Sequence, residues 1–212
     1  ADHDLDARAV MNLRSLPKTV WLLGAISLLN DSASELVYPL LPLYLSSVML
    51  AGPRFLGLME GVAESMTAIL KLASGALSDR FGRRPILLAS NLAIGFDFIM
   101  MALATAMPLL YVGRLINGLV SANFSTAAAY ISDVTAPEKR VQAFGLMGAA
   151  FGMGFVVGPA LGGVLGHYDP HLPFWVAAGM SIANFFYGYF VLPESLQPEL
   201  RVPLNFVKAN PF

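Results

Sequence analysis

Three ionisable side chains interrupt a stretch of sequence that is otherwise apolar enough for a membrane interior. Residues 58–74, LMEGVAESMTAILKLAS, contain Glu60, Glu64 and Lys71. On a helix, Glu64 lies about 40° and Lys71 about 20° around the axis from Glu60, so the three share one face. Such a stripe could bind a proton, a cation or a polar substrate. It could equally form a static polar network that holds two helices together.

The composition indicates a membrane protein. Of the 212 residues, 56% are hydrophobic and 13% are charged, whereas soluble domains carry roughly 25% charged residues. The net charge of −1 gives no sign of a nucleic-acid partner. The sequence has no cysteine, and His3, His167 and His171 have no ligand-like companions. We therefore expect no metal and no other cofactor, and no nucleophile–base constellation points to an enzyme.

Six segments are long and apolar enough to cross a bilayer, which takes about 20 residues. The breaks between them (AGPR, DRFGRR, MP, SDVTAPEKR and HYDPHLP) are turn-prone or charged. We therefore predict an all-α membrane protein with a six-helix transmembrane bundle over residues 19–193, flanked by tails at 1–18 and 194–212. The acidic, polar first ten residues predict no cleavable signal peptide. The expected spans are 19–48, 55–78, 85–106, 108–131, 141–166 and 173–193.

The distribution of Lys and Arg predicts the orientation. With a cytoplasmic N-terminus, the inside segments hold ten basic residues and the outside loops hold only Arg54. Both termini are therefore expected in the cytoplasm of a multi-pass protein of the cell (inner) membrane. The ten inside residues are Arg8, Arg14, Lys18, Arg80, Arg83, Arg84, Lys139, Arg140, Arg201 and Lys208.

Seven charged residues remain inside the expected spans. A charge at the bilayer centre costs about 2.5–3.5 kcal/mol on insertion scales, so these side chains must face protein or a water-filled cavity. The acidic stripe therefore lines an interior. The seven are Asp31, Glu35, Glu60, Glu64, Lys71, Asp97 and Arg114.

The first span carries a matching stripe, because Asp31 and Glu35 are four residues apart. At about 1.5 Å per residue, Glu35 and Glu64 lie about 18 and 15 Å below the outer surface, and Asp31 and Lys71 about 24 and 26 Å. If the first two spans are neighbours, we expect an Asp31–Lys71 ion pair and a Glu35–Glu64 carboxylate pair. Two carboxylates in a partly dehydrated site suit the uptake and release of a proton.

The fifth span is rich in glycines spaced four residues apart. Within GLMGAAFGMGFVVGPALGGVLG, this spacing includes Gly154, Gly158 and Gly162, next to Pro159 and Gly163. Small residues at this spacing let helix backbones approach closely, and the proline adds a kink or weak point. By itself the pattern predicts a tightly packed helix.

Three motifs resemble those of a known family. GALSDRFGRRP at 75–85 resembles the loop between the second and third spans of the major facilitator superfamily. YVGRLINGL resembles the fourth-helix arginine motif of its drug/proton antiporters, including the tetracycline exporters. GFVVGPALGG at 154–163 resembles their fifth-helix antiporter motif, and VLPES the exit from the sixth helix. The resemblance implies a six-helix half of the superfamily fold, built as a 3+3 inverted repeat, with 194–212 resembling the start of the central loop.

The resemblance also implies roles for individual residues. Asp79 and Arg83 would act in a cytoplasmic gate, with Arg83 paired to Asp133. Arg114 would influence proton coupling, and Asp97 takes the place of an acid in the third helix of tetracycline exporters. Gly158 and Pro159 would set the bend of the fifth helix, which suppresses leaks. The full gating set is Gly75, Asp79, Arg80, Gly82, Arg83, Arg84 and Asp133, and the packing motif is Gly154, Gly158, Pro159, Gly162 and Gly163.

The first 75 residues depart from the tetracycline pattern. The acid expected on the first helix falls at Asn30, with Asp31 one place later, and Glu60, Glu64 and Lys71 replace apolar residues. A complete member of the superfamily has twelve spans in two halves, with the substrate between them. We favour a parallel homodimer of half-size chains over a truncated, inert fragment.

We therefore expect a proton-coupled antiporter that exports a drug-like molecule such as tetracycline, and so confers antibiotic resistance. Its partners would be membrane lipid, protons and the substrate. One alternative exchanges Na⁺ or K⁺ for protons at the same acids, whose oxygens suit hard cations. The other is a non-transporting fragment or a modulatory subunit of a full-length transporter.

The orientation can be tested by single-cysteine labelling, because the sequence has no cysteine of its own. Cysteines at 51–53 and 168–170 should react with an impermeant reagent from outside intact cells, whereas cysteines at 79–84 and 135–139 should not. The reversed pattern of accessibility would overturn the topology.

Overall fold

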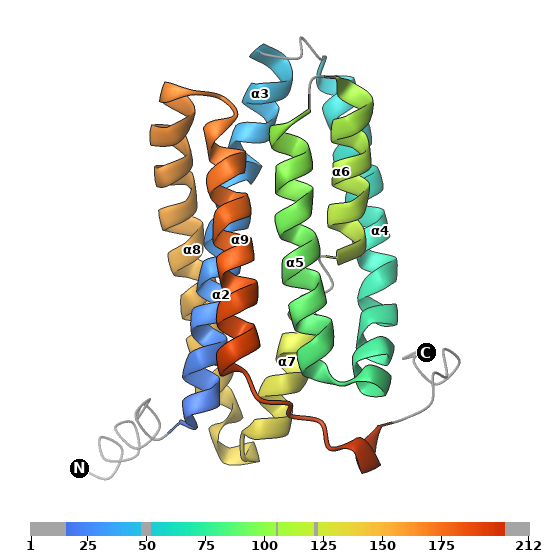
Figure 1. The fold of residues 1–212 in the computed structure, drawn as a ribbon, viewed down its shortest axis with the longest axis vertical. Helices are drawn as coiled ribbons and strands as arrows, with labels where there is room; N and C mark the ends of the chain where they lie inside the picture. The colour runs from blue at the N-terminus through green and yellow to red at the C-terminus, as the bar shows by residue number, and fades with distance from the viewer. Residues whose placement is uncertain (1–15, 48–51, 105, 121–122, 202–212) are drawn as a thin grey trace, which may run out of the picture.

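The computed structural model describes residues 16–47, 52–104, 106–120 and 123–201, which form α-helices joined by short turns and contain no strand (Figure 1). The helices are α2 (Lys18–Val37), α3 (Leu41–Ser47), α4 (Pro53–Phe81), α5 (Arg83–Ala102), α6 (Met107–Val120), α7 (Asn123–Val134), α8 (Arg140–Tyr168) and α9 (Leu172–Val191). Three short 3₁₀ turns lie at Tyr38–Leu40, Pro137–Lys139 and Pro198–Leu200.

The six predicted spans correspond to these helices. By length and hydropathy alone, three helical segments of the described chain could cross a membrane: Arg83–Ala102, Pro137–Tyr168 and Leu172–Val191. The first predicted span is α2 followed by α3, and the fourth is α6 followed by α7, so each consists of two shorter helices. The second is α4, whose charged residues lower its hydropathy. The all-α fold predicted from the sequence is confirmed.

The bend in the first span has a local cause. Pro39 lies in the 3₁₀ turn between α2 and α3. A proline has no N–H to donate and its ring clashes with the preceding turn, so the regular α-helix ends before it. The chain then continues as α3 towards the outer end predicted for the first span.

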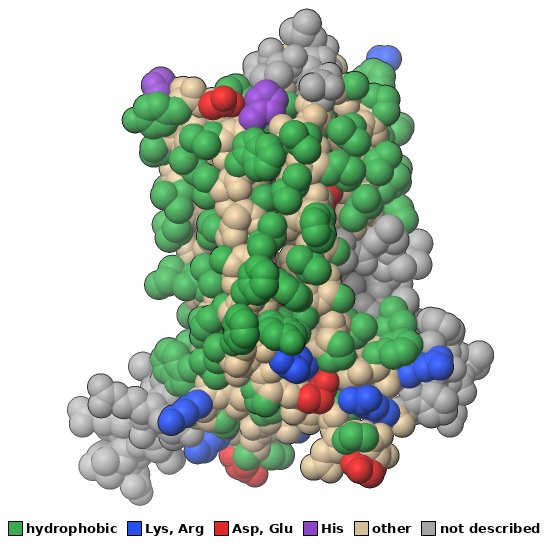
Figure 2. Space-filling view, in the orientation of Figure 1, with side chains coloured by type: hydrophobic (Ala, Val, Ile, Leu, Met, Phe, Trp, Pro, Cys, Tyr) green, Lys and Arg blue, Asp and Glu red, His purple; other side chains and the backbone are tan. Residues whose placement is uncertain are grey.

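The two ends of the bundle differ in charge. α2 begins and α9 ends at the same end of the molecule, as six crossings require (Figure 1). Lys and Arg side chains gather there, and the flanks of the helices above are mainly hydrophobic (Figure 2). We call it the basic end; it is the end predicted to face the cytoplasm.

The helices are not packed in the order of the sequence. α2 packs most extensively against α8, and then against α9, whereas α4 packs mainly against α6. The first span meets α4 chiefly through the short helix α3. The expectation that the first two spans are close neighbours along their length was therefore wrong, because depth along a helix does not decide which helix lies beside it.

Glycines of α8 explain its close contact with α2. Gly154, Gly158 and Gly162 are the buried glycines of this helix. A Cβ on Gly158 would lie 2.6 Å from the Cβ of Glu35 and 2.8 Å from its backbone carbon. A Cβ on Gly154 would lie 2.9 Å from the Cβ of Asp31. The two backbones therefore touch where the first span carries its acids, as the four-residue spacing predicted.

We expect Gly158→Ala to destabilise the protein by about 1–3 kcal/mol, because the new methyl group overlaps the backbone of α2. Gly163→Ala is the matched control, since no atom lies within 4 Å of a Cβ at that position. It should be neutral or stabilising by up to about 1 kcal/mol from helix propensity. Thermal unfolding of both variants in mild detergent measures the difference; equal melting temperatures would contradict a close α2–α8 contact.

Candidate functional site

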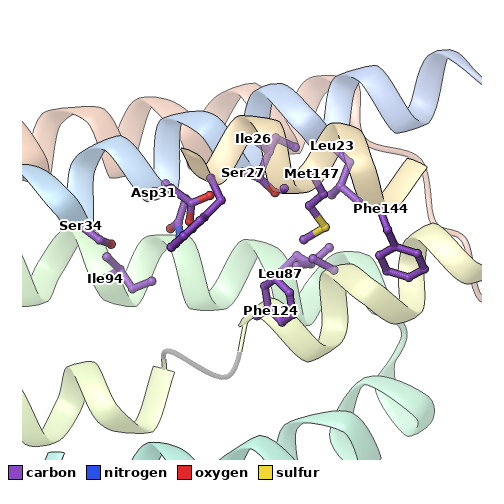
Figure 3. Close-up of a pocket in the computed structure, with 14 residues that line it drawn as sticks. Leu23, Ile26, Ser27, Asp31, Ser34, Leu87, Ile94, Phe124, Phe144 and Met147 are labelled. Carbon is purple, nitrogen blue, oxygen red and sulfur yellow. The ribbon is translucent and has the colours of Figure 1, made fainter. Parts of the chain in front are cut away.

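A cavity of about 600 Å³ lies between α2, α5, α7 and α8 (Figure 3). Its wall is mostly apolar and includes the aromatic rings of Phe124, Phe144 and Phe151. Its polar groups come from α2 alone, because Ser27, Asn30, Asp31 and Ser34 share one face of that helix. A cavity of this size and composition suits a small molecule, with a few polar groups to orient it.

Asp31 is the only ionisable residue among those that line this cavity. It is half-buried, and Asn30 hydrogen-bonds to its side chain. The side-chain amide oxygen of Asn30, Oδ1, is buried without a partner among the described residues. Asp31 and Asn30 therefore offer a carboxylate and a free acceptor to a ligand or a proton.

Glu35 lies one turn further along α2. It is half-buried, and its Cβ packs where α8 has only Gly158. Its predicted partner Glu64 is exposed on α4, and α4 is not packed along α2. The expected Glu35–Glu64 pair is therefore absent from the described structure. The side chain of Lys71 lies outside the described part, so its expected pairing with Asp31 does too.

Glu60, by contrast, has a partner that the sequence did not predict. Its Oε2 lies 2.5 Å from Nη2 of Arg114 on α6, and the Arg114 side chain is only 3% exposed. The guanidinium carbon of Arg114 also lies 4.5 Å from the centre of the Tyr38 ring. Arg114 is thus held by an acid from the second span and an aromatic face from the bend of the first.

Asp97 is a second acid near Arg114. It is buried on α5, and Oδ2 accepts a hydrogen bond of 3.0 Å from the Asn117 amide of α6. Its other oxygen, Oδ1, has no partner among the described residues. Gly113 precedes Arg114, and a Cβ there would lie 3.0 Å from that Oδ1. One buried cation therefore lies near one buried acid, Asp97, and one half-buried acid, Glu60, and its ion pair is with Glu60.

The predicted gating residues meet at the basic end. Arg83, at the start of α5, lies 2.5 Å from Asp79 of α4 and 3.2 Å from Asp133 of α7. Its Nη1 also donates to the Ser78 hydroxyl at 2.6 Å. The predicted contact between Arg83 and Asp133 is therefore present. Of the neighbouring arginines, Arg80 is exposed and lies against the Phe81 ring, and Arg84 is half-buried and lies against the Tyr189 ring.

Glu194 completes this network, although no role was predicted for its carboxylate from the sequence. Its Oε1 accepts hydrogen bonds from the backbone N–H groups of Arg83 at 2.9 Å and of Ser195 at 3.0 Å. It therefore caps the start of α5, where free N–H groups and the helix dipole favour an anion. In the sequence, the one signal for this role was its position three residues after the end of α9, directly after Pro193.

Gly82 is required at this junction for two reasons. Its φ is +105°, in the region that favours glycine. A Cβ there would also overlap the Glu194 carboxylate.

Gly75, the remaining glycine of the loop motif, lies within α4. In the antiporter motif α8 continues through Pro159, and Gly163 faces open space.

The comparisons with known proteins agree with the motifs. Residues 20–207 match the family model described as Major Facilitator Superfamily. The class C tetracycline resistance protein of Escherichia coli is 37% identical over 94% of this chain and 50% of that protein. The class B protein of the same organism is 36% identical over 80% of this chain and 43% of that protein. The chain thus spans about half the length of these relatives.

A solved structure shows the same fold. The human organic anion transporter MFSD10 (TETRAN) aligns with a TM-score of 0.78 and 26% identity, over 92% of this chain and 53% of that one. The resemblance predicted from the loop and helix motifs is confirmed by both kinds of comparison.

We expect Glu60→Gln to destabilise the protein by about 3–5 kcal/mol, because it leaves the buried Arg114 without its partner. Glu64→Gln is the matched control one turn away, since Glu64 is exposed. Its effect should stay within about 0.5 kcal/mol. Thermal unfolding in detergent measures the stability of both single variants. The double variant Glu60→Gln/Arg114→Gln should recover part of the stability that Glu60→Gln loses. Equal stability of the two single variants would show that the Glu60–Arg114 contact contributes nothing.

Proposed function

We propose, from the premise that this chain belongs to the major facilitator superfamily, that it is half of a proton-coupled exporter working by alternating access. The substrate we infer is a drug-like small molecule such as tetracycline. The observation that carries this proposal is the cavity of about 600 Å³, with Asp31 as its ionisable group. The likeness to two tetracycline resistance proteins at 36–37% identity supports the choice of substrate.

Asp31 is suited to exchange a proton for a substrate. A carboxylate in a mostly apolar cavity is costly as a free anion, so it is stabilised either by a proton or by a ligand that donates hydrogen bonds to it. The two occupants exclude each other at the same oxygens. Binding of the substrate then expels the proton, and rebinding of a proton from outside releases the substrate.

The Arg114 cluster supplies a second place for a proton. With both acids ionised, Glu60 and Asp97 would leave an uncompensated negative charge beside one guanidinium, which a membrane interior disfavours. One proton shared between them removes that charge. Tyr38, in the bend of the first span, lies against the Arg114 guanidinium. A change in the charge around Arg114 therefore alters a contact made by the turn between α2 and α3.

Contacts at the basic end join four of the six spans to one another. The ion pairs of Arg83 join α4, α5 and α7, and Glu194 joins the segment after α9 to the start of α5. We infer that these contacts hold the half as one body, which alternates between two orientations against a second half.

We propose that a second copy of this chain supplies the other half. The matched relatives are about twice the length of the chain. Apolar side chains are exposed along α8, including Phe151 and Phe155 next to the cavity wall, and the charged Glu64 is exposed on α4. A two-fold axis along the membrane normal would cover these groups and close the cavity.

The test is exchange in vesicles that contain the purified protein and a pH-sensitive dye. Addition of tetracycline should release protons, and Asp31→Asn should reduce that release to background because the residue can no longer carry a proton. Glu138→Gln, an exposed acid in the turn before α8, is the matched control and should behave as wild type.

The other outcomes decide against the proposal. Proton release on adding Na⁺ or K⁺, with none on adding tetracycline, would identify a cation antiporter. No response to either would indicate a modulatory subunit. Wild-type protomers mixed with Asp31→Asn protomers should transport less than simple dilution predicts if the unit is a dimer; strict proportionality would contradict the dimer alone.

A further inference from the structure

Arg84 is a cation at the basic end that forms no ion pair with an acid of the described chain. It is the second residue of α5 and is half-buried. Its Nη2 donates to the backbone carbonyl of Tyr189 at 2.6 Å, and its guanidinium carbon lies 5.5 Å from the centre of the Tyr189 ring. Among the described residues, the arginines in ion pairs are Arg83 and Arg114.

The acids near Arg84 already have other donors. Oε1 of Glu194 accepts hydrogen bonds from backbone N–H groups at the start of α5. Asp79 and Asp133 pair with Arg83. A guanidinium has five N–H donors, and the Arg84 side chain makes one hydrogen bond to the described residues. Arg84 therefore keeps a positive charge and further donors for an anion from outside the chain.

The contacts with Tyr189 hold the guanidinium in place before any anion binds. The backbone carbonyl fixes one end of the planar group, and the aromatic ring lies against it. An arginine held in this way loses less conformational entropy when it binds an anion than a freely moving surface side chain does.

Arg84 and Tyr189 lie at the depth of the lipid headgroups. α5 and α9 are both long and apolar enough to cross a membrane. Arg84 lies at the start of α5, and Tyr189 lies in the last turn of α9. Both types of side chain are common at this boundary, because their apolar parts stay in the membrane while the polar ends reach the headgroups.

The surface beside this pair is aromatic and belongs to a helix that does not line the cavity. Phe186 and Phe190 of α9 are 52% and 78% exposed. Their helix contributes no residue to the described wall of the cavity. The flank of the bundle above the basic end is mainly hydrophobic on this face (Figure 2). The second half proposed above covers α8 and α4, so this surface of α9 stays in contact with lipid.

We propose that Arg84 and Tyr189 form a binding site for the phosphate of an anionic phospholipid, in the leaflet at the basic end. The phosphate oxygens accept hydrogen bonds from the guanidinium, which is suited to this geometry. The acyl chains of the same lipid lie along Phe186 and Phe190. A soluble phosphate would meet the charge but leave these rings uncovered, so the combined surface favours a lipid.

The bound lipid would join the start of α5 to the end of α9. Glu194, just after α9, already connects the same two segments through its hydrogen bond to the backbone of Arg83. An anionic lipid at Arg84 would therefore stabilise the basic end from its membrane side, where the described chain provides no acid for this arginine.

The test is native mass spectrometry of the purified protein in detergent, titrated with dioleoylphosphatidylglycerol. Wild type should retain the lipid, and Arg84→Gln should weaken its binding about five- to tenfold. Lys18→Gln is the matched control, because Lys18 is an exposed cation at the same end and the change in charge is the same. It should bind the lipid as wild type does. Unchanged binding by Arg84→Gln, or an equal loss in both variants, would overturn the proposal.

A second measurement uses wild-type protein alone. Dioleoylphosphatidylglycerol should raise the melting temperature in detergent more than dioleoylphosphatidylcholine, whose ammonium group offsets the charge of its phosphate. Inorganic phosphate should leave the melting temperature unchanged. An equal rise with the two lipids, or a rise with inorganic phosphate that identifies a free-anion site, would overturn the proposal. Neither measurement involves transport, so failure of the lipid site and failure of the exporter are distinguishable.

Discussion

The close contact between α2 and α8 is the constraint on which the rest of the site depends. Gly154 and Gly158 allow the backbone of α2 to lie against α8 at the positions of Asp31 and Glu35. A side chain at either glycine would push the helices apart and open the wall of the cavity. Because α2 supplies all the polar groups of that wall, its placement by α8 decides whether Asp31 faces a cavity or lipid.

The helices and the small-residue contact could be predicted from the sequence because each depends on local pattern, and the contact between Arg83 and Asp133 could be predicted from the resemblance of the loop motif. Prediction failed where the answer depends on which helices are neighbours. Counting residues gave Glu35 and Glu64 similar depths, but α4 lies beside α6, so Glu60 meets Arg114 instead. Glu194 was missed for a related reason: its partner at the start of α5 is distant in sequence, and only the fold brings the two together.

Charged and titratable groups are placed at three levels with different surroundings. At the basic end, Arg83 and Glu194 are satisfied by several partners and stabilise the fold. In the middle, Glu60 and Asp97 each have a buried oxygen without a partner among the described residues, and Asp31 lines the cavity. At the opposite end, His171 contacts the Tyr44 hydroxyl and the Asp169 carboxylate.

The central claim is that a proton and the substrate compete for Asp31. The most direct measurement is proton release on tetracycline binding to the purified protein in lipid nanodiscs, followed with a pH indicator in weak buffer. The account predicts that binding of tetracycline to wild type releases protons, and that Asp31→Asn binds without releasing any. Full proton release from Asp31→Asn, or tetracycline binding to wild type with no release, would contradict it.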